Sequence, residues 1–366
     1  MRQWFSIQGL RALAVLLVVG AHEHDFLDRF HIHSIFQTLT ALESWGVDLF
    51  FVISGFVMMT AHWNDFDVAG SPARFLMRRA IRIFPMYWLV TLLLYGLFSA
   101  LPGLLHNWVG GHSNLALSLA LLVPRGRYPL LWVGWTLVFE MYFYYVFAAS
   151  LNFSRRLALT LIGGWAALIV VLQFVPLSQN IWYKTLTDGL VLEFTLGVLA
   201  GTLVAKKMVL RTAPSLGLVA LACVALTFAF HAAYDPRHEL HVDLPLRFLT
   251  VGMPMALLLY GAVCLEARKK FAIPATFLFL GDASYSIYLT HAVFYVALGR
   301  ILSRSIPGHM PAFVTILVVP IAVVLGGCAV YRWVERPLLK LSRARAAHVF
   351  PVTMARRLDA LSSRPA

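Results

Sequence analysis

Apolar residues in this chain gather into long stretches separated by short polar segments, without the alternation that half-buried strands show. A helix needs about 20 predominantly apolar residues to cross a bilayer. Such stretches occur at residues 7–24, 45–62, 84–101, 131–150, 156–175, 186–205, 212–231, 247–265, 275–298 and 312–333. The pattern predicts an all-α integral membrane protein with about ten transmembrane helices. A shorter stretch at 114–123 predicts a re-entrant or interfacial segment.

The composition agrees with a bilayer environment. Of the 366 residues, 60% are hydrophobic and 13% are charged, and the mean hydropathy is +0.76. These values exclude an ordinary soluble domain. Cys223, Cys264 and Cys328 fall within expected helices and lack metal-ligand spacing, so we interpret them as packing residues that form neither a disulfide nor a metal site.

The basic residues predict the orientation. If both termini are cytoplasmic, most of the 30 lysines and arginines fall on cytoplasmic segments, as the positive-inside rule requires. The net charge of +13 then reflects topology, and no nucleic-acid partner is expected. We expect a transmembrane domain at 1–341 and a basic, disordered cytoplasmic tail at 342–366. The first 22 residues resemble a signal peptide, but their removal would leave an odd number of spans.

Two polar side chains lie on the otherwise apolar first helix. Ten residues separate Arg11 from His22, which places them about 20° apart around the axis and roughly 16 Å apart along it. Ionisable residues on one face of a transmembrane helix indicate an intramembrane path. The alternative is that Arg11 snorkels to the cytoplasmic edge and His22 marks the outer interface.

Other ionisable residues fall inside spans or at their ends. Asp48 begins the second span and is expected at the depth of His22, where a carboxylate can orient the imidazole of a general base. Glu140 is expected near the middle of the membrane. These residues form a candidate catalytic set together with His291.

His291 shares a helical face with two hydroxyl groups. Ser284, Tyr288 and His291 stand at i, i+4 and i+7, which directs them to the same side of one helix. A lone histidine in a helix is more often a packed core residue, but the shared hydroxyls favour a functional face.

A row of arginines precedes the third span. Arg74, Arg78 and Arg82 recur every four residues and are expected to stack on one helical face. Guanidinium groups bind phosphates through two parallel hydrogen bonds. The alternative is that these charges only set the topology. The row contains arginines and no lysine, and Arg11 enters the membrane nearby, which favours a phosphate site.

Six blocks of sequence, in order over nearly the whole chain, resemble the membrane-bound acyltransferase type 3 family. They are the Arg11/His22 spacing, GVDLFFVISGF at 46–56, RRAIRIFPMYW at 78–88, WTLVFE at 135–140, SYSIYLTH at 284–291 and ERP at 335–337. Within the family, the short form without a fused periplasmic domain resembles enzymes that O-acetylate bacterial exopolysaccharides.

The resemblance implies transfer of an acyl group, usually acetyl from cytosolic acetyl-CoA, to a sugar hydroxyl at the outer face of the bacterial inner membrane. It assigns donor binding to Arg11, Arg78, Arg79 and Arg82, and catalysis to His22, Asp48 and Glu140. Acetyl-CoA is expected as a co-substrate, with no permanently bound cofactor. Further expected partners are a polysaccharide or lipid-linked oligosaccharide acceptor, membrane lipids, and the polysaccharide synthesis and export machinery.

Several alternatives stay open at this point. His22 either deprotonates the sugar hydroxyl or carries the acyl group itself. Glu23 or Asp25 could assist His22 in place of Asp48. A transporter or flippase would also carry midplane ionisable residues, although no inverted repeat is found in the sequence. A structural scaffold of a polysaccharide-synthesis complex would leave the buried polar residues unexplained.

Overall fold

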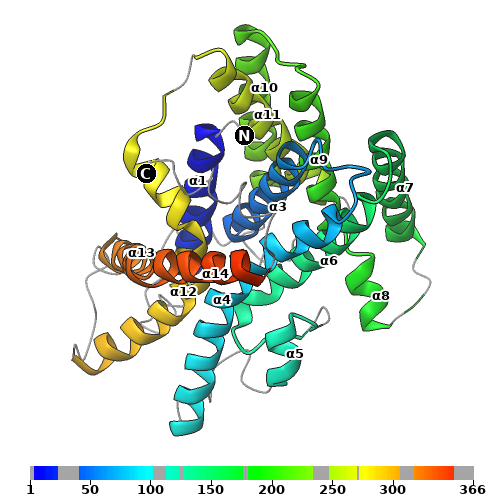
Figure 1. Ribbon diagram of the computed structural model, residues 1–366. Helices are drawn as coiled ribbons and strands as arrows, with labels where there is room; N and C mark the ends of the chain where they lie inside the picture. Colours follow the sequence, from blue (N-terminus) through cyan, green and yellow to red (C-terminus); the bar gives the residue numbers. More distant parts are fainter. Residues whose placement is uncertain are drawn as a thin grey trace.

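The computed structural model describes residues 4–23, 41–101, 113–123, 127–175, 178, 180–233, 247–269, 272–305 and 317–349, and every regular element there is a helix (Figure 1). The elements are α1 (Phe5–Ala21), α3 (Ala41–Ala61), α4 (Ser71–Ala100), α5 (Leu115–Ala120), η3 (Trp132–Gly134), α6 (Trp135–Ser150), α7 (Arg155–Phe174), α8 (Ile181–Leu186), α9 (Val191–Ala205), α10 (Thr212–Ala233), η4 (Phe248–Gly252), α11 (Met253–Ala267), α12 (Ala275–Ser305), α13 (Val319–Val330), η6 (Tyr331–Glu335) and α14 (Arg336–Val349).

Each of the ten apolar stretches expected from the sequence overlaps a helix. Among the described residues, six helical segments are long and apolar enough to cross a membrane: Ser71–Ala100, Arg155–Phe174, Ile181–Ala205, Thr212–His231, Phe248–Ala267 and Ala275–Leu302. Phe5–Ala21 and Trp45–Ala61 are shorter apolar helices. The chain is therefore a multi-pass, all-helical membrane protein. A total of ten crossings and the cytoplasmic position of both termini stay predictions.

The predicted boundary at residue 341 falls inside a helix. α14 runs without interruption from Arg336 to Val349, so the prediction of a disordered tail is wrong for 342–349. This segment is rich in leucine, alanine, arginine and lysine and contains no glycine, a composition that favours a helix. Residues 350–366 lie outside the described part of the chain.

The short apolar segment near residue 115 forms α5, a helix of six residues. The Asn114 side chain caps it by accepting a hydrogen bond from the Leu117 amide at 3.0 Å. Tyr87 of α4 donates its hydroxyl hydrogen bond to the Ser118 carbonyl at 2.8 Å. A helix of this length cannot cross a bilayer, as the sequence predicts.

Burial separates the central helices from the peripheral ones. Two thirds (67%) of the most apolar window is buried in both Ile181–Ala205 and Phe248–Ala267, against 17% in α7 and α10. The apolar surfaces of α7 and α10 are those that a lipid environment would cover. Figure 1 shows α7 at the edge of the helical assembly.

Glycines bring α3 and α9 into backbone contact. A Cβ atom at Gly55 would lie 2.0 Å from the Phe194 carbonyl oxygen, and one at Gly197 would lie 2.0 Å from the Val52 carbonyl oxygen. Small residues allow this close approach between membrane helices, where packing and not hydrophobic burial drives association. The α3–α9 pair consequently forms a fixed unit beside α6.

α1 is held between α3 and α12 in the same way. A Cβ atom at Gly46 of α3 would lie 2.5 Å from the Ala14 carbonyl oxygen, and one at Gly281 of α12 would lie 2.1 Å from the Gln8 carbonyl oxygen. The Glu266 carboxylate at the end of α11 accepts the backbone N–H groups of Phe5 and Ser6. It thus satisfies two free donors at the start of α1 and complements the helix dipole there.

Replacing Gly197 by Ala should destabilise the protein, because the added methyl group overlaps the α3 backbone and forces the two helices apart. Gly164→Ala in α7 is the matched control, since nothing lies within 4 Å of the added atom. We expect a lower thermal unfolding midpoint in detergent for Gly197→Ala and an unchanged or slightly higher one for Gly164→Ala. Equal midpoints in the two variants would contradict the close packing of α3 and α9.

Candidate active site

A cavity opens between α1, α3, α4, α6 and α12. It encloses about 870 Å³, part of which is open space at its mouth. Its lining combines three arginines, one carboxylate and six hydroxyl groups: Arg11, Arg79, Arg82, Glu140, Ser54, Thr136, Tyr144, Ser284, Tyr285 and Tyr288. Apolar residues, most of them on α3, form the remaining wall. Such a mixture of charged and hydroxyl side chains in a membrane protein marks a functional cavity.

The cavity has two chemically different ends. Arg79 lies near Tyr144, and Tyr288 lies at Thr136; these two α6 residues are eight positions apart, or roughly 12 Å along the helix axis. We call the part around Arg79 and Arg82 the arginine end. The part around Thr136 and Tyr288 is the histidine end, because His22 and His291 lie just beyond it.

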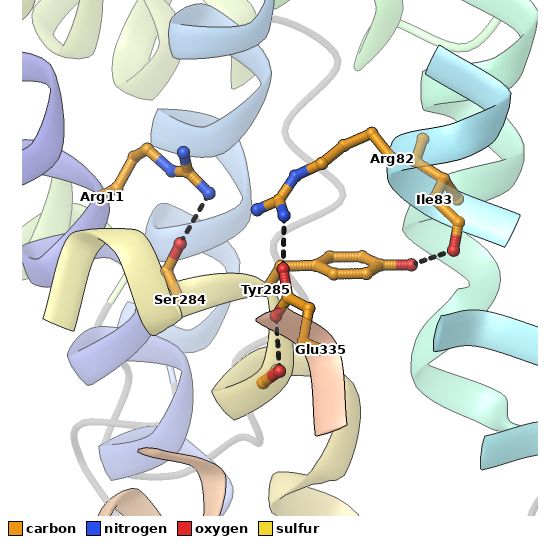
Figure 2. Close-up of polar contacts among 7 residues, drawn as sticks. Arg11, Arg82, Ile83, Ser284, Tyr285 and Glu335 are labelled. Atoms are coloured by element: carbon orange, nitrogen blue, oxygen red, sulfur yellow. Dashed lines mark hydrogen bonds and ion pairs between the residues drawn. The ribbon is translucent and has the colours of Figure 1, made fainter. Parts of the chain in front are cut away.

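Arg82 is fixed in the arginine end by a carboxylate from another part of the chain. Its guanidinium forms an ion pair with Glu335, which is fully buried and also accepts the Ser286 hydroxyl. The Tyr285 ring lies 5.4 Å from the guanidinium, and its hydroxyl donates to the Ile83 carbonyl at 2.8 Å. Figure 2 shows the Arg82 guanidinium pointing toward Glu335, with the Tyr285 ring alongside. These partners hold the Arg82 guanidinium, whose side chain is 29% exposed, in one position at the arginine end.

Arg11 approaches the same region from α1. Its guanidinium donates to the Ser284 hydroxyl at 2.9 Å (Figure 2). Because α1 is helical from Phe5 to Ala21, the predicted rise from Arg11 to His22 holds in the structure. Arg11 lines the cavity, whereas His22 lies beyond its histidine end. Arg11 does not simply snorkel to a surface.

The predicted arginine face is partly wrong. Arg79 and Arg82 line the cavity, while Arg78 does not, and Arg74 donates to the Ala69 carbonyl at 3.1 Å. Arg79 lies 5.4 Å from both the Phe75 and the Tyr144 ring. Arg79 and Arg82 stand three positions apart and share the face of α4 that the packing of neighbouring helices turns toward the cavity. The i, i+4 spacing included Arg82 on this face but not Arg79.

Glu140 lies within the cavity wall on α6. It accepts hydrogen bonds from Ser54 of α3 at 3.1 Å and from Tyr144, one turn along its own helix. The sequence predicted a buried carboxyl at this depth but not its hydroxyl partners. These hydrogen bonds lower the cost of burying the carboxyl group.

The two candidate histidines meet across α1 and α12. The ring centroids of His22 and His291 are 4.7 Å apart, and Trp132 lies 5.0 Å from His22. The sequence predicted His22 and His291 as site residues, and the structure brings them together. Trp132 was not anticipated, since a tryptophan near a helix start is equally typical of a membrane interface.

Backbone contacts determine which ring nitrogen is basic. Nδ1 of His22 lies 2.9 Å from the Val18 carbonyl, and Nδ1 of His291 lies 2.5 Å from the Tyr288 carbonyl. A carbonyl oxygen can only accept, so each Nδ1 carries the proton and each neutral imidazole keeps its lone pair on Nε2. This tautomer is the one in which Nε2 serves as a general base.

The structure pairs Asp48 with Arg247 rather than with His22. One carboxylate oxygen of Asp48 accepts from Nε of Arg247 at 3.1 Å and from its terminal nitrogen at 2.7 Å. Glu193 of α9 lies beside Asp48 and is also fully buried. The expected Asp48–His22 contact was inferred from depth alone, and equal depth does not determine which neighbouring helix a side chain faces.

The predicted face of α12 is confirmed in the structure. Ser284 binds Arg11, Tyr288 lines the cavity, and His291 contacts His22. Tyr288 also contacts the Thr136 hydroxyl at 2.8 Å and the Val133 carbonyl at 3.0 Å. One helical face of α12 therefore runs from the arginine end to the histidine pair.

Sequence reasoning assigned no role to Arg247 or Glu335. Arg247 was counted among the topology-setting charges, although it is the first residue of the expected span at 247–265. Glu335 contributed only to the family resemblance. The described part of the chain holds no group of three His, Cys, Asp or Glu residues that could bind a metal ion. Cys223, Cys264 and Cys328 are free thiols.

Comparisons with known proteins agree with the resemblance seen in the sequence. A family model described as "Acyltransferase domain" matches residues 4–332. The chain is 35% identical to the exopolysaccharide production protein ExoZ of Rhizobium meliloti, over 82% of this chain and 90% of ExoZ. It is 26% identical to the acyltransferase MdmB of Streptomyces mycarofaciens, over 92% of each chain. No solved structure matches.

Removing the Asp48 carboxylate should destabilise the protein, because the Arg247 guanidinium loses the two hydrogen bonds that it donates to this buried group. Breaking such a pair typically costs about 3–5 kcal/mol. We expect Asp48→Ala to lower the thermal unfolding midpoint strongly, and the double variant Asp48→Leu/Arg247→Met to recover part of the loss. An Asp48→Ala protein that unfolds like the wild type but is inactive would instead place Asp48 in the chemistry.

Proposed function

The chain belongs to the membrane-bound acyltransferase type 3 family, and from this premise we propose that it transfers an acetyl group from cytosolic acetyl-CoA to a sugar hydroxyl. The acceptor in this proposal is an exported polysaccharide or its lipid-linked precursor at the outer face of the inner membrane. The observation that carries the proposal is a cavity that runs from an arginine end to Tyr288, behind which a pair of histidines lies.

The arginine end suits the phosphate groups of CoA. These groups cannot enter an apolar interior, so they stay near the mouth, where Arg79 and Arg82 offer guanidinium donors. The pantetheine arm is roughly 15 to 20 Å long when extended, as follows from ordinary covalent dimensions. It can therefore follow the cavity and deliver the thioester at the histidine end.

In the chemical step, Nε2 of His22 takes the proton of the acceptor hydroxyl. The hydroxyl oxygen forms a bond to the thioester carbonyl carbon, the carbon–sulfur bond breaks, and the CoA thiolate leaves and takes up a proton. Transfer through an acyl-histidine intermediate would use the same nitrogen as nucleophile. Both routes require the lone pair that the Val18 carbonyl contact leaves on Nε2.

Tyr288 stands between the cavity and His22. Its hydroxyl contacts Thr136 and Val133, so the acetyl group reaches His22 only after the Tyr288 side chain rotates. Each of the two hydrogen bonds contributes about 1 kcal/mol net. Thermal motion can therefore rotate the Tyr288 side chain out of the way. We do not expect this rotation to limit the rate of acetyl transfer.

The acceptor class is suggested by similarity. ExoZ carries the name of an exopolysaccharide production protein, and this chain matches 90% of its length. An acyl group moved from one membrane face to the other would allow cytosolic acetyl-CoA to modify a polymer that has left the cytosol. NMR comparison of polymer acyl content between a deletion strain and its parent would identify the modified sugar.

Replacing His22 by Ala should abolish acetyl transfer, with a loss of about 10²- to 10⁴-fold in turnover if His22 is the base. Binding of acetyl-CoA should persist, because the arginine end is unchanged. Purified protein with radiolabelled acetyl-CoA and acceptor measures both quantities. His231→Ala is the control, since His231 is exposed at the end of α10, away from the cavity.

Two results would contradict this assignment. Near-wild-type turnover in His22→Ala would mean that another residue carries the chemistry. Movement of a lipid-linked sugar without release of free CoA would favour the transporter alternative, in which no thioester is cleaved.

Replacing both Arg79 and Arg82 by Lys should weaken acetyl-CoA binding about tenfold, roughly 1.4 kcal/mol. Lysine keeps the positive charge but loses the planar donor geometry that fits phosphate. Arg74→Lys is the matched control on the same helix, because its side chain binds the Ala69 carbonyl outside the cavity. Calorimetry gives the affinities; equal values for the double variant and the wild type would reduce these arginines to topology-setting charges.

A further inference from the structure

The cavity ends short of the histidine pair. Thr136 and Tyr288 line it, whereas His22 and His291 do not. The Tyr288 ring lies 5.7 Å from the His291 ring and 6.0 Å from the Phe50 ring, measured between centroids. Tyr288 therefore forms the boundary between the space open to a donor and the histidines behind it.

Hydrogen bonds between α12 and the start of α6 hold this boundary in place. Tyr288 belongs to α12, and its hydroxyl reaches Thr136 at 2.8 Å and the Val133 carbonyl at 3.0 Å, on the opposite side of the cavity. The Thr136 hydroxyl also lies 3.3 Å from the Val133 carbonyl oxygen, so the two hydroxyl groups and this carbonyl form one cluster. The phenol ring consequently spans the histidine end, with Phe50 of α3 beside it. We call Tyr288, Thr136 and Phe50 the end wall.

The position of the end wall limits what a thioester can carry. The cavity lining extends from Tyr144 to Thr136 along α6, roughly 12 Å, and from Val57 to Val47 along α3, roughly 15 Å. A pantetheine arm of roughly 15 to 20 Å, anchored by its phosphates at the mouth, already extends to the wall. The acyl chain beyond the sulfur then meets Tyr288 and Phe50, and each additional methylene must displace a packed aromatic ring.

We propose that the end wall selects the acyl group by its length, so that acetyl is accepted and chains of four or more carbons are excluded. The inference rests on the proposed function, because it assumes that an acyl-CoA occupies the cavity. A wall of packed side chains discriminates by about 10- to 200-fold for each methylene. In this proposal, the space that Tyr288 opens by rotation accommodates an acetyl group but not a longer chain.

The test compares acetyl-, butyryl- and hexanoyl-CoA as donors. We expect the wild-type kcat/KM for butyryl-CoA to be at least about 100-fold below that for acetyl-CoA. Tyr288→Ala removes the ring and should raise the butyryl-to-acetyl ratio at least about tenfold, even if transfer of both groups slows. Thr136→Val keeps the shape but removes one hydrogen-bond partner of Tyr288, and should raise the ratio by a smaller factor.

A matched control tests the specificity of these changes. Tyr142 also lies on α6, but its hydroxyl donates to the Leu186 carbonyl outside the cavity. Tyr142→Ala should leave the butyryl-to-acetyl ratio unchanged. An equal rise of the ratio in Tyr142→Ala would mean that general loosening of the helices, and not the end wall, sets the acyl length.

Binding to the His22→Ala protein separates the two proposals. Acetyl-CoA that binds more tightly than butyryl-CoA, with the preference reduced by Tyr288→Ala, supports the end wall. Equal binding and equal transfer of all three donors would overturn the end wall while leaving the acyltransferase function intact. If no acyl-CoA binds to the His22→Ala protein or to the wild type, the proposed function itself fails.

Discussion

A guanidinium group that lies among apolar helices must find hydrogen-bond acceptors in place of water, and this requirement organises the site. Arg82 obtains a carboxylate from Glu335, Arg11 obtains the Ser284 hydroxyl, and Arg247 obtains Asp48. In each pair the partner comes from a different helical element. The cost of burying charge is therefore met by contacts that also join helices far apart in the sequence.

These polar contacts depend on close helix packing, which the glycines provide. Gly46 and Gly281 allow α3 and α12 to approach α1 from two sides. Arg11 can then reach Ser284, and His22 can meet His291, because both contacts cross from α1 to α12. Wider helix spacing would separate the histidines and leave Arg11 without its acceptor. Gly46 and Gly281 therefore determine both the spacing of the helices and the contacts that Arg11 and His22 make with α12.

The sequence predicted features that depend on one helix and missed those that depend on the neighbours of a helix. The spacing of Arg11 and His22 and the common face of Ser284, Tyr288 and His291 follow from helical geometry alone, and both appear in the structure. Asp48 was expected at His22 because the two share a depth. Depth leaves the direction around the helix axis undetermined, and Asp48 faces Arg247 instead.

The same limitation explains the errors at the arginine end and at the C-terminus. A four-residue repeat identified an arginine-rich face, but the contacts of α4 with its neighbours place Arg79 rather than Arg78 in the cavity. Glu335 lies in η6, distant in sequence from Arg82, so no local pattern could pair them. The end of the folded part was misplaced because a high basic charge was interpreted as disorder, although α14 consists of good helix formers.

The central claim is that the donor enters at the arginine end and the acceptor is modified at the opposite membrane face. Proteoliposomes containing the protein in one known orientation, with acetyl-CoA and acceptor confined to chosen sides, measure this directly. We predict acetylated product only when acetyl-CoA is on the side of Arg79 and Arg82 and the acceptor is on the other side. Product formed only when both substrates share one side would contradict acyl transfer across the membrane.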